Sequence, residues 1–353
     1  MPHALTIRET RAKGGKVYYP LQLSLVPKPS PGNNELLVKI GAAALNHRDI
    51  FIRQNLYPSI SFTAPLLSDG YGIVVEAGPG CTTDLVGKPV LLTPCRGWEN
   101  SPGGPEDWTQ FSTIGGTGPH HSLGAAQHFA VVHESEVEPC PEHLNAVQGA
   151  ALPSCGLTAW RALTTKCNNA PAGSNILVTG IGGGVALQVL QFGVALGCHM
   201  YVTSSSEKKI ERARNMGAKG GVLYTDDEWP KKLLSMLPAE QPYIEAVIDG
   251  AGGDIVIKAI PFLKPGAIIS SYGMTVAPVM DWPMQAVLKN IELRGSTLGS
   301  RQEFKNMVEF VRRHRIRPMV CRTVKGLDCV DAIEGLFEDL KEGRQFGKLV
   351  IEL

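Results

Sequence analysis

The segment "NILVTGIGGGVALQVLQFGVALG", residues 175–197, limits the possible folds of this 353-residue chain more than any other part of it. An apolar, strand-like run leads into Gly180, Gly182, Gly183 and Gly184, and a helical pattern follows at once. Glycine suits such a turn because a Cβ would keep the backbone N–H groups and the helix N-terminus away from a pyrophosphate. A glycine-rich turn alone is weak evidence for a dinucleotide site and is also compatible with a simple β–α turn, so its value depends on its surroundings.

Those surroundings repeat the same alternation of strand and helix. Five further strand-like runs follow, separated by helical segments: "HMYVT", "GVLY", "IEAVIDG", "AIISSYG" and "IELRGSTL". The helix expected around "SSSEKKIERARNMGA" begins at serines that can cap it and ends at a glycine. Six strands separated by helices predict an α/β domain with a doubly wound parallel sheet.

The two ends of the chain have a different pattern. Residues 1 to about 150 carry short strand-like runs broken by Gly and Pro, which predicts an irregular, mostly β region. The tail from about residue 300 carries one or two helices and closes with "GKLVIEL", a strand that we expect to return to the first region. The predicted domains are therefore 1–153 together with 300–353, and 154–299. Within the first, residues 95–126 have little periodicity, which favours a functional loop.

Composition narrows the class of partner. The 34 Lys and Arg nearly balance the 33 Asp and Glu, and no basic stripe appears, so neither nucleic acid nor an anionic membrane is expected as a partner. The eight cysteines are scattered without a CxxC pair, which argues against a disulfide framework. With no signal peptide and no apolar run of membrane-spanning length, we expect a cytoplasmic protein that acts on a small molecule.

The end of the second strand of the parallel sheet bears on the choice of dinucleotide. NAD sites usually carry an Asp or Glu about twenty residues after the glycine turn. Here the strand ends in four hydroxyl residues, Thr203 to Ser206, and no carboxylate stands at its end. Hydroxyls and a nearby lysine can bind a 2′-phosphate, although the serines also suit a helix cap and the lysines a solvated face. The pattern favours NADP(H) over NAD(H).

Several motifs together resemble a known family. They include "ALNHRDIFIRQNLYP", "SDGYGIVVEAG", "ALPSCGLTAWRAL", "LKPGAIISSYG" and "GKLVIEL", spread over the whole chain. The chain resembles the medium-chain dehydrogenase/reductase superfamily, specifically its zinc-independent quinone oxidoreductase and enoyl reductase branch. The resemblance implies a Rossmann domain inserted in a GroES-like β domain, and a homodimer.

The resemblance also bears on a metal site. Zinc-dependent relatives hold their catalytic ion through a Cys, a His next to a Glu, and a second Cys. The matching positions here are Asn46, Ser68 followed by Asp69, and Ser154, none of which is a usual zinc ligand. The closely spaced cysteines of a structural zinc lobe are absent, and the His120-His121 pair has no partners at ligand spacing. We therefore predict no metal.

Site residues follow from the same resemblance. It implies catalytic roles for Asn46, near the nicotinamide ribose, and for Tyr57, a substrate-site phenol that also suits simple packing on a wall. Its cofactor-binding positions are Asn46, Thr158, Gly183, Gly184, Val185, Ser204, Ser205, Lys209, Tyr224, Gly250 and Gly273. For His47, Arg48 and Arg53 an exposed cationic loop is the expectation, with Asp49 orienting it. Tyr71 departs from the small residue usual between the glycines of its motif.

Without a metal, hydrogen-bond donors and one proton donor must handle the charge that develops on the acceptor oxygen. Activated C=C bonds and quinones need less help than simple ketones, which gain more from a Lewis acid. The sequence thus favours an NADPH-dependent, zinc-independent reductase of an enone, enoyl compound or quinone. An NADP-linked carbonyl or alcohol oxidoreductase, a non-catalytic dinucleotide-binding protein and a catalyst of a non-redox rearrangement remain alternatives.

Overall fold

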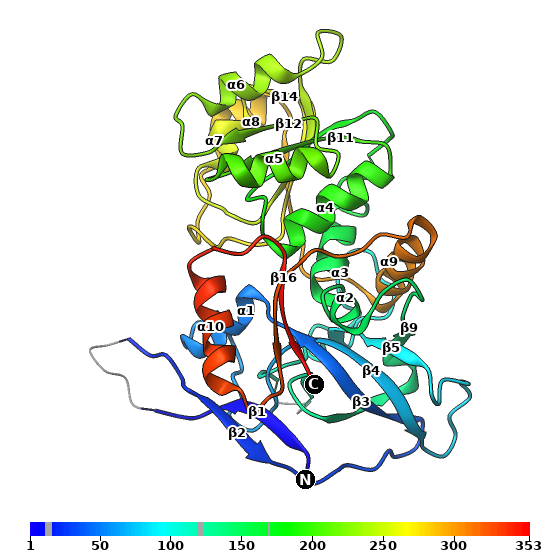
Figure 1. Ribbon diagram of the computed structural model, residues 1–353. Helices are drawn as coiled ribbons and strands as arrows, with labels where there is room; N and C mark the ends of the chain where they lie inside the picture. The colour runs from blue at the N-terminus through cyan, green and yellow to red at the C-terminus, as the bar shows by residue number, and fades with distance from the viewer. Residues whose placement is uncertain (11–15, 119–122, 169) are drawn as a thin grey trace. The chain divides into compact units, whose positions relative to one another are not determined.

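The computed structural model forms two compact units, which are described separately (Figure 1). Unit 1 comprises Met1–Ser154 and Ser300–Leu353, and unit 2 comprises Cys155–Gly299. The boundary at 154/155 lies one residue after the predicted one. The structure describes residues 1–10, 16–118, 123–168 and 170–353, so the His120-His121 pair lies outside the described residues.

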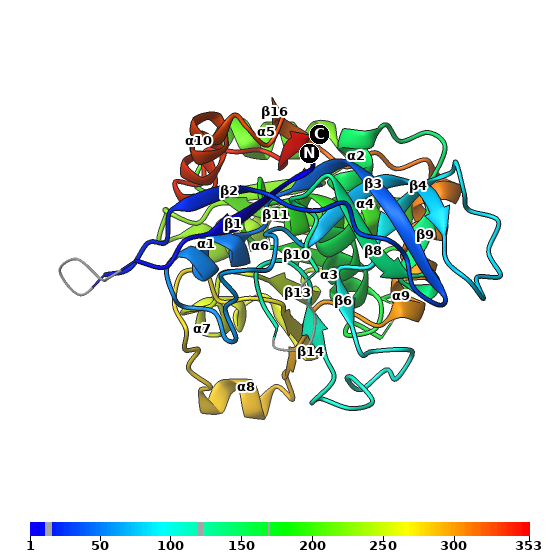
Figure 2. The same cartoon turned by 90° about the horizontal axis from the view of Figure 1, so that it is seen from below.

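Unit 1 is built on a sheet with the strand order β16-β17-β3-β4-β5-β9, in which β8 also pairs with β3. Figure 2 shows its two longest strands, β3 (Glu35–Ala44) and β4 (Asp69–Ala77), running antiparallel side by side. The C-terminal strand β17 (Lys348–Glu352) pairs with β3, with Val350 opposite Ala44. The tail therefore does return to the N-terminal region.

The remaining elements of unit 1 complete this sheet, as β5, β8, β9 and β16 do, or lie outside it. They are β1 (His3–Ile7), β2 (Leu21–Leu25), α1 (His47–Arg53), β5 (Pro89–Leu92), β6 (Cys95–Arg96), β7 (Ser112–Thr113), β8 (Phe129–His133), β9 (Val137–Pro139), α2 (Ala146–Ala150), α9 (Arg301–His314), β16 (Val320–Lys325) and α10 (Val330–Lys341), with a 3-10 turn at Glu134–Glu136. Helix α9 begins at Ser300, whose side chain accepts from Glu303 N in a reciprocal capping box. The helices α1 and α2 are additions to the mostly β region that the sequence predicted.

Tyr71 shows how unit 1 accommodates a large residue where a small one is usual. A Cβ on Gly149 of α2 would lie 2.6 Å from Cδ2 of Tyr71, which is closer than real contacts allow. The ring therefore occupies space that the glycine leaves open, beside a cluster of small buried residues that includes Ala42, Ala44 and Ala150. The large Tyr71 on β4 is thus matched by the small Gly149 on α2, and the packing density of the core is preserved.

The long aperiodic segment after β5 is folded around its own side chains. The Glu106 carboxylate accepts three backbone N–H bonds of 2.8–2.9 Å, from Glu99, Asn100 and Ser101. These bonds lower the pKa of Glu106 to about 2. Trp98 is 2% exposed and lies edge-on to Phe111. A carboxylate and an aromatic pair thus order this segment, which the sequence presented only as a loop.

Unit 2 contains the predicted parallel sheet, with the order β12-β11-β10-β13-β14-β15. All its strand pairs are parallel. Its strands are β10 (Asn175–Val178), β11 (His199–Ser204), β12 (Gly220–Leu223), β13 (Ile244–Asp249), β14 (Leu263–Ser271) and β15 (Glu292–Gly295). Its helices are α4 (Gly184–Ala195), α5 (Glu207–Asn215), α6 (Trp229–Met236), α7 (Ile255–Ala259) and α8 (Met284–Leu288), while α3 (Pro153–Leu163) enters from unit 1.

The burial of these strands explains why their continuous apolar runs could be recognised in the sequence. All four residues of β10 are buried, as expected for a central parallel strand covered on both faces. One local prediction differs: Ser206 is the N-cap of α5, but its side chain makes no capping hydrogen bond.

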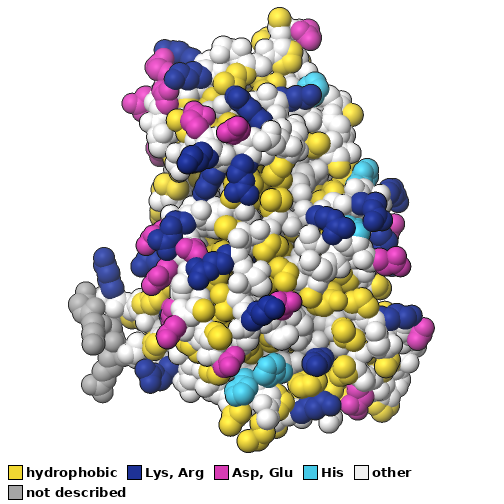
Figure 3. All heavy atoms as spheres, viewed as in Figure 1, with side chains coloured by type: hydrophobic (Ala, Val, Ile, Leu, Met, Phe, Trp, Pro, Cys, Tyr) yellow, Lys and Arg dark blue, Asp and Glu magenta, His cyan; other side chains and the backbone are white. Residues whose placement is uncertain are grey.

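Among the described residues no helix is long and apolar enough to cross a membrane. On the face drawn in Figure 3, basic and acidic side chains are interspersed.

Candidate functional site

The glycine turn of unit 2 has the backbone that a bound diphosphate requires. Gly180 and Gly182 have φ values of 66° and 122°, in the region that favours glycine. Gly183 is the N-cap of α4 and supplies no side-chain cap to the helix. A Cβ on Gly180 would meet no atom within 4 Å, and one on Gly183 would meet only Gly180 O at 3.8 Å. The turn is therefore an open cradle at a helix N-terminus, and it fits a dinucleotide.

The turn stands at the switch point of the sheet, where β10 has β11 on one side and β13 on the other. A polar pair lies at this point. Thr179 Oγ1 donates to the buried Asp249 carboxylate at 2.6 Å, and Gly252 N donates to the same group at 2.8 Å. Burial raises the pKa of Asp249. Neither residue of this pair was singled out from the sequence, although both end strands that were predicted.

The predicted 2′-phosphate residues have different surroundings. Ser204 is 2% exposed; its hydroxyl donates to Ile181 O and accepts from Ser206 N, so it braces the turn. Ser205 is exposed and Lys209 half-buried at the start of α5. Tyr224, just after β12, is 47% exposed, and its backbone N–H donates to Ser204 O. Of the two predicted serines, Ser205 is the accessible one.

The other predicted cofactor positions lie on neighbouring elements of unit 2. Thr158 is buried on α3, and Gly184 and Val185 form the first turn of α4. A Cβ on Gly250 would lie 2.4 Å from the ring of Tyr272, whereas one on Gly273 would be 3.4 Å from Gly250 O. Gly250 therefore leaves room for a tyrosine that was not identified from the sequence.

In unit 1, the positions that the sequence resemblance matches to zinc ligands of relatives are joined by hydrogen bonds. Asn46 Nδ2 donates to Ser68 Oγ at 3.3 Å and to Asp69 Oδ2 at 2.9 Å. Ser68 Oγ lies 3.0 Å from Ser154 Oγ, and Ser154 N donates to Asp69 Oδ1 at 2.7 Å. The end of β3, the start of β4 and the start of α3 thus meet around the buried Asp69 carboxylate. We refer to these four residues and Lys348 as the Asn46 network.

Lys348, at the start of β17, supplies the cation of the Asn46 network. Its side chain is 4% exposed, and its Nζ donates to Leu45 O, Asn46 Oδ1 and Asp69 Oδ2 at 2.6–2.7 Å. Three donors therefore meet three acceptors. The contact with Oδ1 fixes the Asn46 amide, whose two hydrogens are directed at Ser68 and Asp69. This lysine was visible in the sequence only as part of the terminal strand.

The donor set of the Asn46 network does not fit zinc. Its ligand atoms would be an amide oxygen and two hydroxyls, whereas zinc sites in proteins use Cys, His and carboxylate groups. The Asn46 oxygen already accepts from Lys348, and a buried ammonium stands beside the carboxylate. Across the residues that the structure describes, no group of three or more His, Cys, Asp or Glu can hold a metal ion.

The expectation of an exposed cationic loop after Asn46 is wrong for its two arginines. Arg53 is 1% exposed and makes a bidentate bond to Glu334 at 2.7 Å. Arg48 donates to the carbonyls of Ile114 and Gly115, and so ties α1 to the long segment after β5. The sequence could not show these contacts because Glu334 and the segment around Ile114 are distant from α1 along the chain.

Tyr57 lies partly buried beside Arg48, whose guanidinium carbon is 4.8 Å from the ring centroid. Its ring packs against the unit 1 core, which is the packing alternative, while its hydroxyl makes no hydrogen bond within the described part of the chain. A phenol held by its ring and open at its hydroxyl retains the capacity to donate.

Asp49 is fully buried and orients the start of α1, as expected. Its Oδ2 accepts from Asn46 N at 2.7 Å, while Oδ1 lies 3.6 Å from Arg48 and has no hydrogen-bond partner among the described residues. Burial raises the pKa of Asp49 to about 6 against the opposing effect of Arg48. The carboxylate therefore carries a cost of desolvation at neutral pH.

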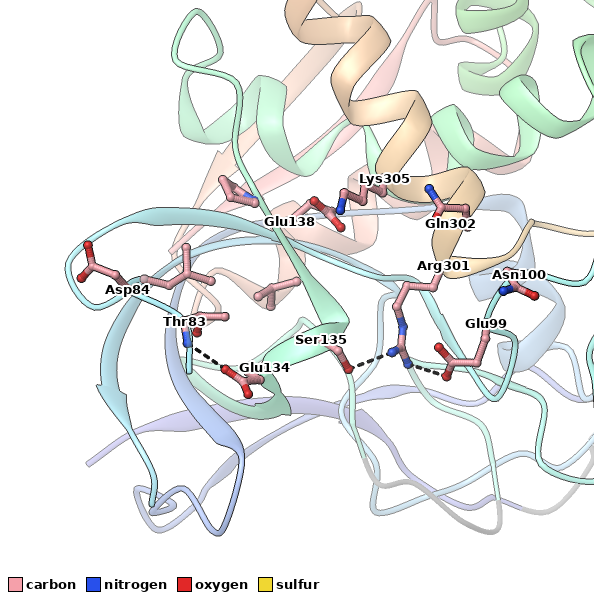
Figure 4. Close-up of a pocket in the computed structure, with 13 residues that line it drawn as sticks. Thr83, Asp84, Glu99, Asn100, Glu134, Ser135, Glu138, Arg301, Gln302 and Lys305 are labelled. Atoms are coloured by element: carbon pink, nitrogen blue, oxygen red, sulfur yellow. Dashed lines mark hydrogen bonds and ion pairs between the residues drawn. The ribbon is translucent and has the colours of Figure 1, made fainter. Parts of the chain in front are cut away.

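A separate hollow of about 600 Å³ lies on unit 1 (Figure 4). Its charged residues largely satisfy one another: Arg301 bonds Ser135 Oγ at 2.8 Å and Glu99 at 3.0 Å. Glu134 accepts from the backbone of Thr83. The sequence-predicted site residues are not among those that line it. The hollow is therefore a polar surface feature and we do not assign the reaction to it.

The geometry defines a dinucleotide-binding oxidoreductase fold with an attached β unit, and comparison with known proteins agrees. An alcohol dehydrogenase GroES-like domain model matches residues 32–142 and a zinc-binding dehydrogenase model matches residues 184–313. The chain belongs to the medium-chain dehydrogenase/reductase superfamily. It is 65% identical to the zinc-type alcohol dehydrogenase-like protein YogA of Leptosphaeria maculans, over the whole length of both chains.

Two solved structures share the fold. An NAD-dependent alcohol dehydrogenase aligns with a TM-score of 0.85 at 26% identity, covering all of both chains. A crotonyl-CoA carboxylase/reductase in complex with NADP aligns with a TM-score of 0.80 at 21% identity, covering 99% of this chain and 94% of the other. The family assignment makes this chain an oxidoreductase that uses a nicotinamide dinucleotide.

Proposed function

We propose that this protein is an NADPH-dependent, zinc-independent reductase that transfers hydride to an activated C=C bond, in an enone or enoyl compound, or to a quinone. The observation that carries the proposal is the Asn46 network. The resemblance matches Asn46, Ser68 and Ser154 to the metal-ligand positions of zinc-dependent relatives, and in this chain their amide and hydroxyl groups are joined by hydrogen bonds beside the Lys348 ammonium. An acceptor that is already activated needs hydrogen-bond donors rather than a Lewis acid.

The preference for NADPH rests on the region after β11. No carboxylate stands at the end of this strand to repel a 2′-phosphate, and the exposed Ser205 and the lysine at 209 offer a hydroxyl and a positive charge. The pyrophosphate would lie on the open turn formed by Gly183, Gly184 and Val185. The related structures point in both directions, since one is NAD-dependent and another binds NADP.

The protein residues have separate tasks in this scheme. When bound, reduced nicotinamide supplies the hydride. The glycine turn and α4 hold the dinucleotide phosphates, and Ser204 braces that turn through Ile181. The Asn46 network would supply hydrogen-bond donors to the developing negative charge, and Lys348 fixes the orientation of its amide. The Tyr57 hydroxyl is the candidate proton donor.

The first experiment follows NADPH and NADH absorbance with purified protein and three acceptors: a 1,4-quinone, 2-cyclohexen-1-one and cyclohexanone, each with and without EDTA. We expect loss of NADPH absorbance with the quinone or the enone, unchanged by EDTA, and a lower kcat/KM with NADH. Turnover of cyclohexanone that EDTA abolishes would contradict the proposal. Tyr57→Phe should then separate proton donation from packing, because it keeps the ring and removes the hydroxyl.

A carbonyl or alcohol oxidoreductase is the second candidate, because the related proteins are described as alcohol dehydrogenases or alcohol dehydrogenase-like. It would reduce cyclohexanone as well as the enone, in the presence of EDTA. Binding of NADPH without turnover of any acceptor would instead identify a non-catalytic dinucleotide-binding protein.

We further propose a cytoplasmic homodimer. The eight cysteines are thiols rather than disulfides, which suits a reducing compartment. Strand β15 ends the parallel sheet, and the segment that leads to it exposes large apolar residues, including Val276 at 80% and Leu288 at 75%. An open strand edge with exposed apolar residues suits a second copy of the chain. Light scattering of the wild type and Leu288→Glu tests this, with a dimer and a monomer as the expected results.

A further inference from the structure

The direction of hydrogen bonding between the two serines of the Asn46 network follows from their burial. By distance alone either hydroxyl can donate to the other. Ser68 is fully buried and already accepts from Asn46 Nδ2, so its own hydrogen has one acceptor within the described residues, Ser154 Oγ. The reverse direction would leave the hydrogen of Ser68 without an acceptor at a fully buried position that no outside group can reach, which is strongly unfavourable, whereas Ser154 retains 6% exposure. Ser68 therefore donates to Ser154.

This direction leaves the hydroxyl hydrogen of Ser154 unused. Ser154 is 6% exposed, and in the described part of the chain its Oγ contacts no polar atom other than Ser68 Oγ. Its backbone N–H donates to Asp69, which fixes the first turn of α3. The molecule thus holds a buried, rigidly placed O–H group whose acceptor must come from outside the network.

We propose that Ser154 Oγ donates a hydrogen bond to the carbonyl oxygen of the acceptor, a role that nothing in the sequence had assigned to it. The inference rests on the proposed function. Hydride from the reduced dinucleotide, which is oxidised, adds to the β-carbon of the enone. The π pair of the C=C bond forms the enolate, whose negative charge resides largely on oxygen. Ser154 stabilises this oxygen. A proton from the Tyr57 hydroxyl, which water then reprotonates, converts the enolate to the saturated ketone.

Two features strengthen this donor. Asn46, Ser68 and Ser154 donate in one direction, and aligned hydrogen bonds polarise one another. Ser154 also lies in the first turn of an 11-residue helix, where backbone dipoles favour negative charge. Lys348 is a positioning residue in this scheme because its bond to Asn46 Oδ1 sets the amide orientation.

The test compares Ser154→Ala and Ser154→Thr with the wild type. With 2-cyclohexen-1-one and NADPH we expect kcat/KM to fall about 100-fold in Ser154→Ala and to recover largely in Ser154→Thr, which restores the hydroxyl. The Kd of NADPH should not change. Alanine keeps the backbone bond to Asp69, so both variants should fold. Ser112→Ala, which removes a hydroxyl of unit 1 outside the network, is the matched control and should behave as the wild type.

A second measurement does not depend on turnover. Infrared difference spectra of ¹³C=O-labelled cyclohexenone, bound with oxidised NADP, should show a carbonyl band shifted to lower frequency in the wild type and Ser154→Thr. The shift should be absent in Ser154→Ala. If Ser154→Ala fails to fold, Ser154→Cys supplies a weak donor of similar size and should show a reduced shift.

The outcomes separate the two proposals. A wild type that reduces the enone, with equal rates and equal carbonyl bands in Ser154→Ala, overturns the role of Ser154 and leaves the proposed function in place. A wild type that reduces no acceptor overturns the proposed function. A Ser154-dependent carbonyl shift would then still support the hydrogen bond.

Discussion

The glycine turn of unit 2 and the Asn46 network of unit 1 build sites by opposite means. The turn offers backbone N–H groups and empty space, and its key residues carry no side chain at all. The network offers polar side chains that hold one another in place around a buried carboxylate and a buried ammonium. A backbone site is generic and recurs wherever a diphosphate is bound. A side-chain site depends on particular residues, and our proposal that this chain works without zinc rests on the site of this kind in unit 1.

We expect the largest effect from removing the positive charge of Lys348 from the Asn46 network. Lys348→Met leaves the Asp69 carboxylate buried without its cation, and we expect unit 1 to lose about 3–5 kcal/mol of stability. Denaturant unfolding measures this. The double variant Lys348→Met, Asp69→Asn removes both charges and should recover most of the loss. A single variant as stable as the wild type would mean that Asp69 is not charged in the folded protein.

The second prediction concerns Asp49, a buried carboxylate beside the Asn46 network, and the free energy that its ionisation costs in the folded protein. Its pKa rises from 3.8 in the unfolded chain to about 6 when folded, so the folded state binds the proton more readily. The stability that this provides is complete below pH 3.8 and is lost as the pH rises through 6. Asp49→Asn cannot ionise, so its stability relative to the wild type should increase by about 2–3 kcal/mol between these limits.

Denaturant midpoints of the Asp49→Asn protein and the wild type at pH 4, 5, 6 and 7 measure this change. The introduced amide should keep the bond from the backbone of Asn46, because an amide oxygen can replace Oδ2. A difference between the two proteins that is the same at every pH would contradict burial as the cause of the raised pKa.

Of these variants, one with a side chain added at Gly183 of the glycine turn should change the stability of the fold least. Gly183 has φ −72°, which any residue can adopt, and open space around its Cβ position. Gly183→Val should therefore change the melting temperature little, but it should weaken NADPH binding at least about tenfold, or ~1.4 kcal/mol, by occupying the phosphate cradle. Calorimetric titration with NADPH measures the affinity.

Gly103→Val is the matched control for the filled turn. It places the same side chain at an open glycine of unit 1 and should leave NADPH affinity unchanged. Equal affinities in the two variants would show that the cradle does not bind the phosphates, and the contrast between the two sites would be lost.

Local sequence patterns were enough to predict the parallel sheet, the glycine turn and the return of the last strand to the first region. These predictions depend on continuous apolar runs for buried strands, and on glycine where the backbone must turn left-handed. The sequence also marked Asn46, Ser68 and Ser154 as positions without metal-ligand chemistry. It did not reveal that Arg53 is buried and Arg48 partly buried, because their partners Glu334 and Ile114 lie far along the chain.

The surroundings of Asn46, Ser68 and Ser154 could be learned from the tertiary structure alone. Lys348 and Asp69 are 279 residues apart and meet because β17 returns to β3 beside β4. The direction of the Ser68–Ser154 hydrogen bond depends on which hydroxyl is more deeply buried, and burial is a property of the assembled core rather than of a motif. Local sequence sets backbone conformation, whereas the charge balance and hydrogen bonding of a buried site depend on residues that only folding brings together.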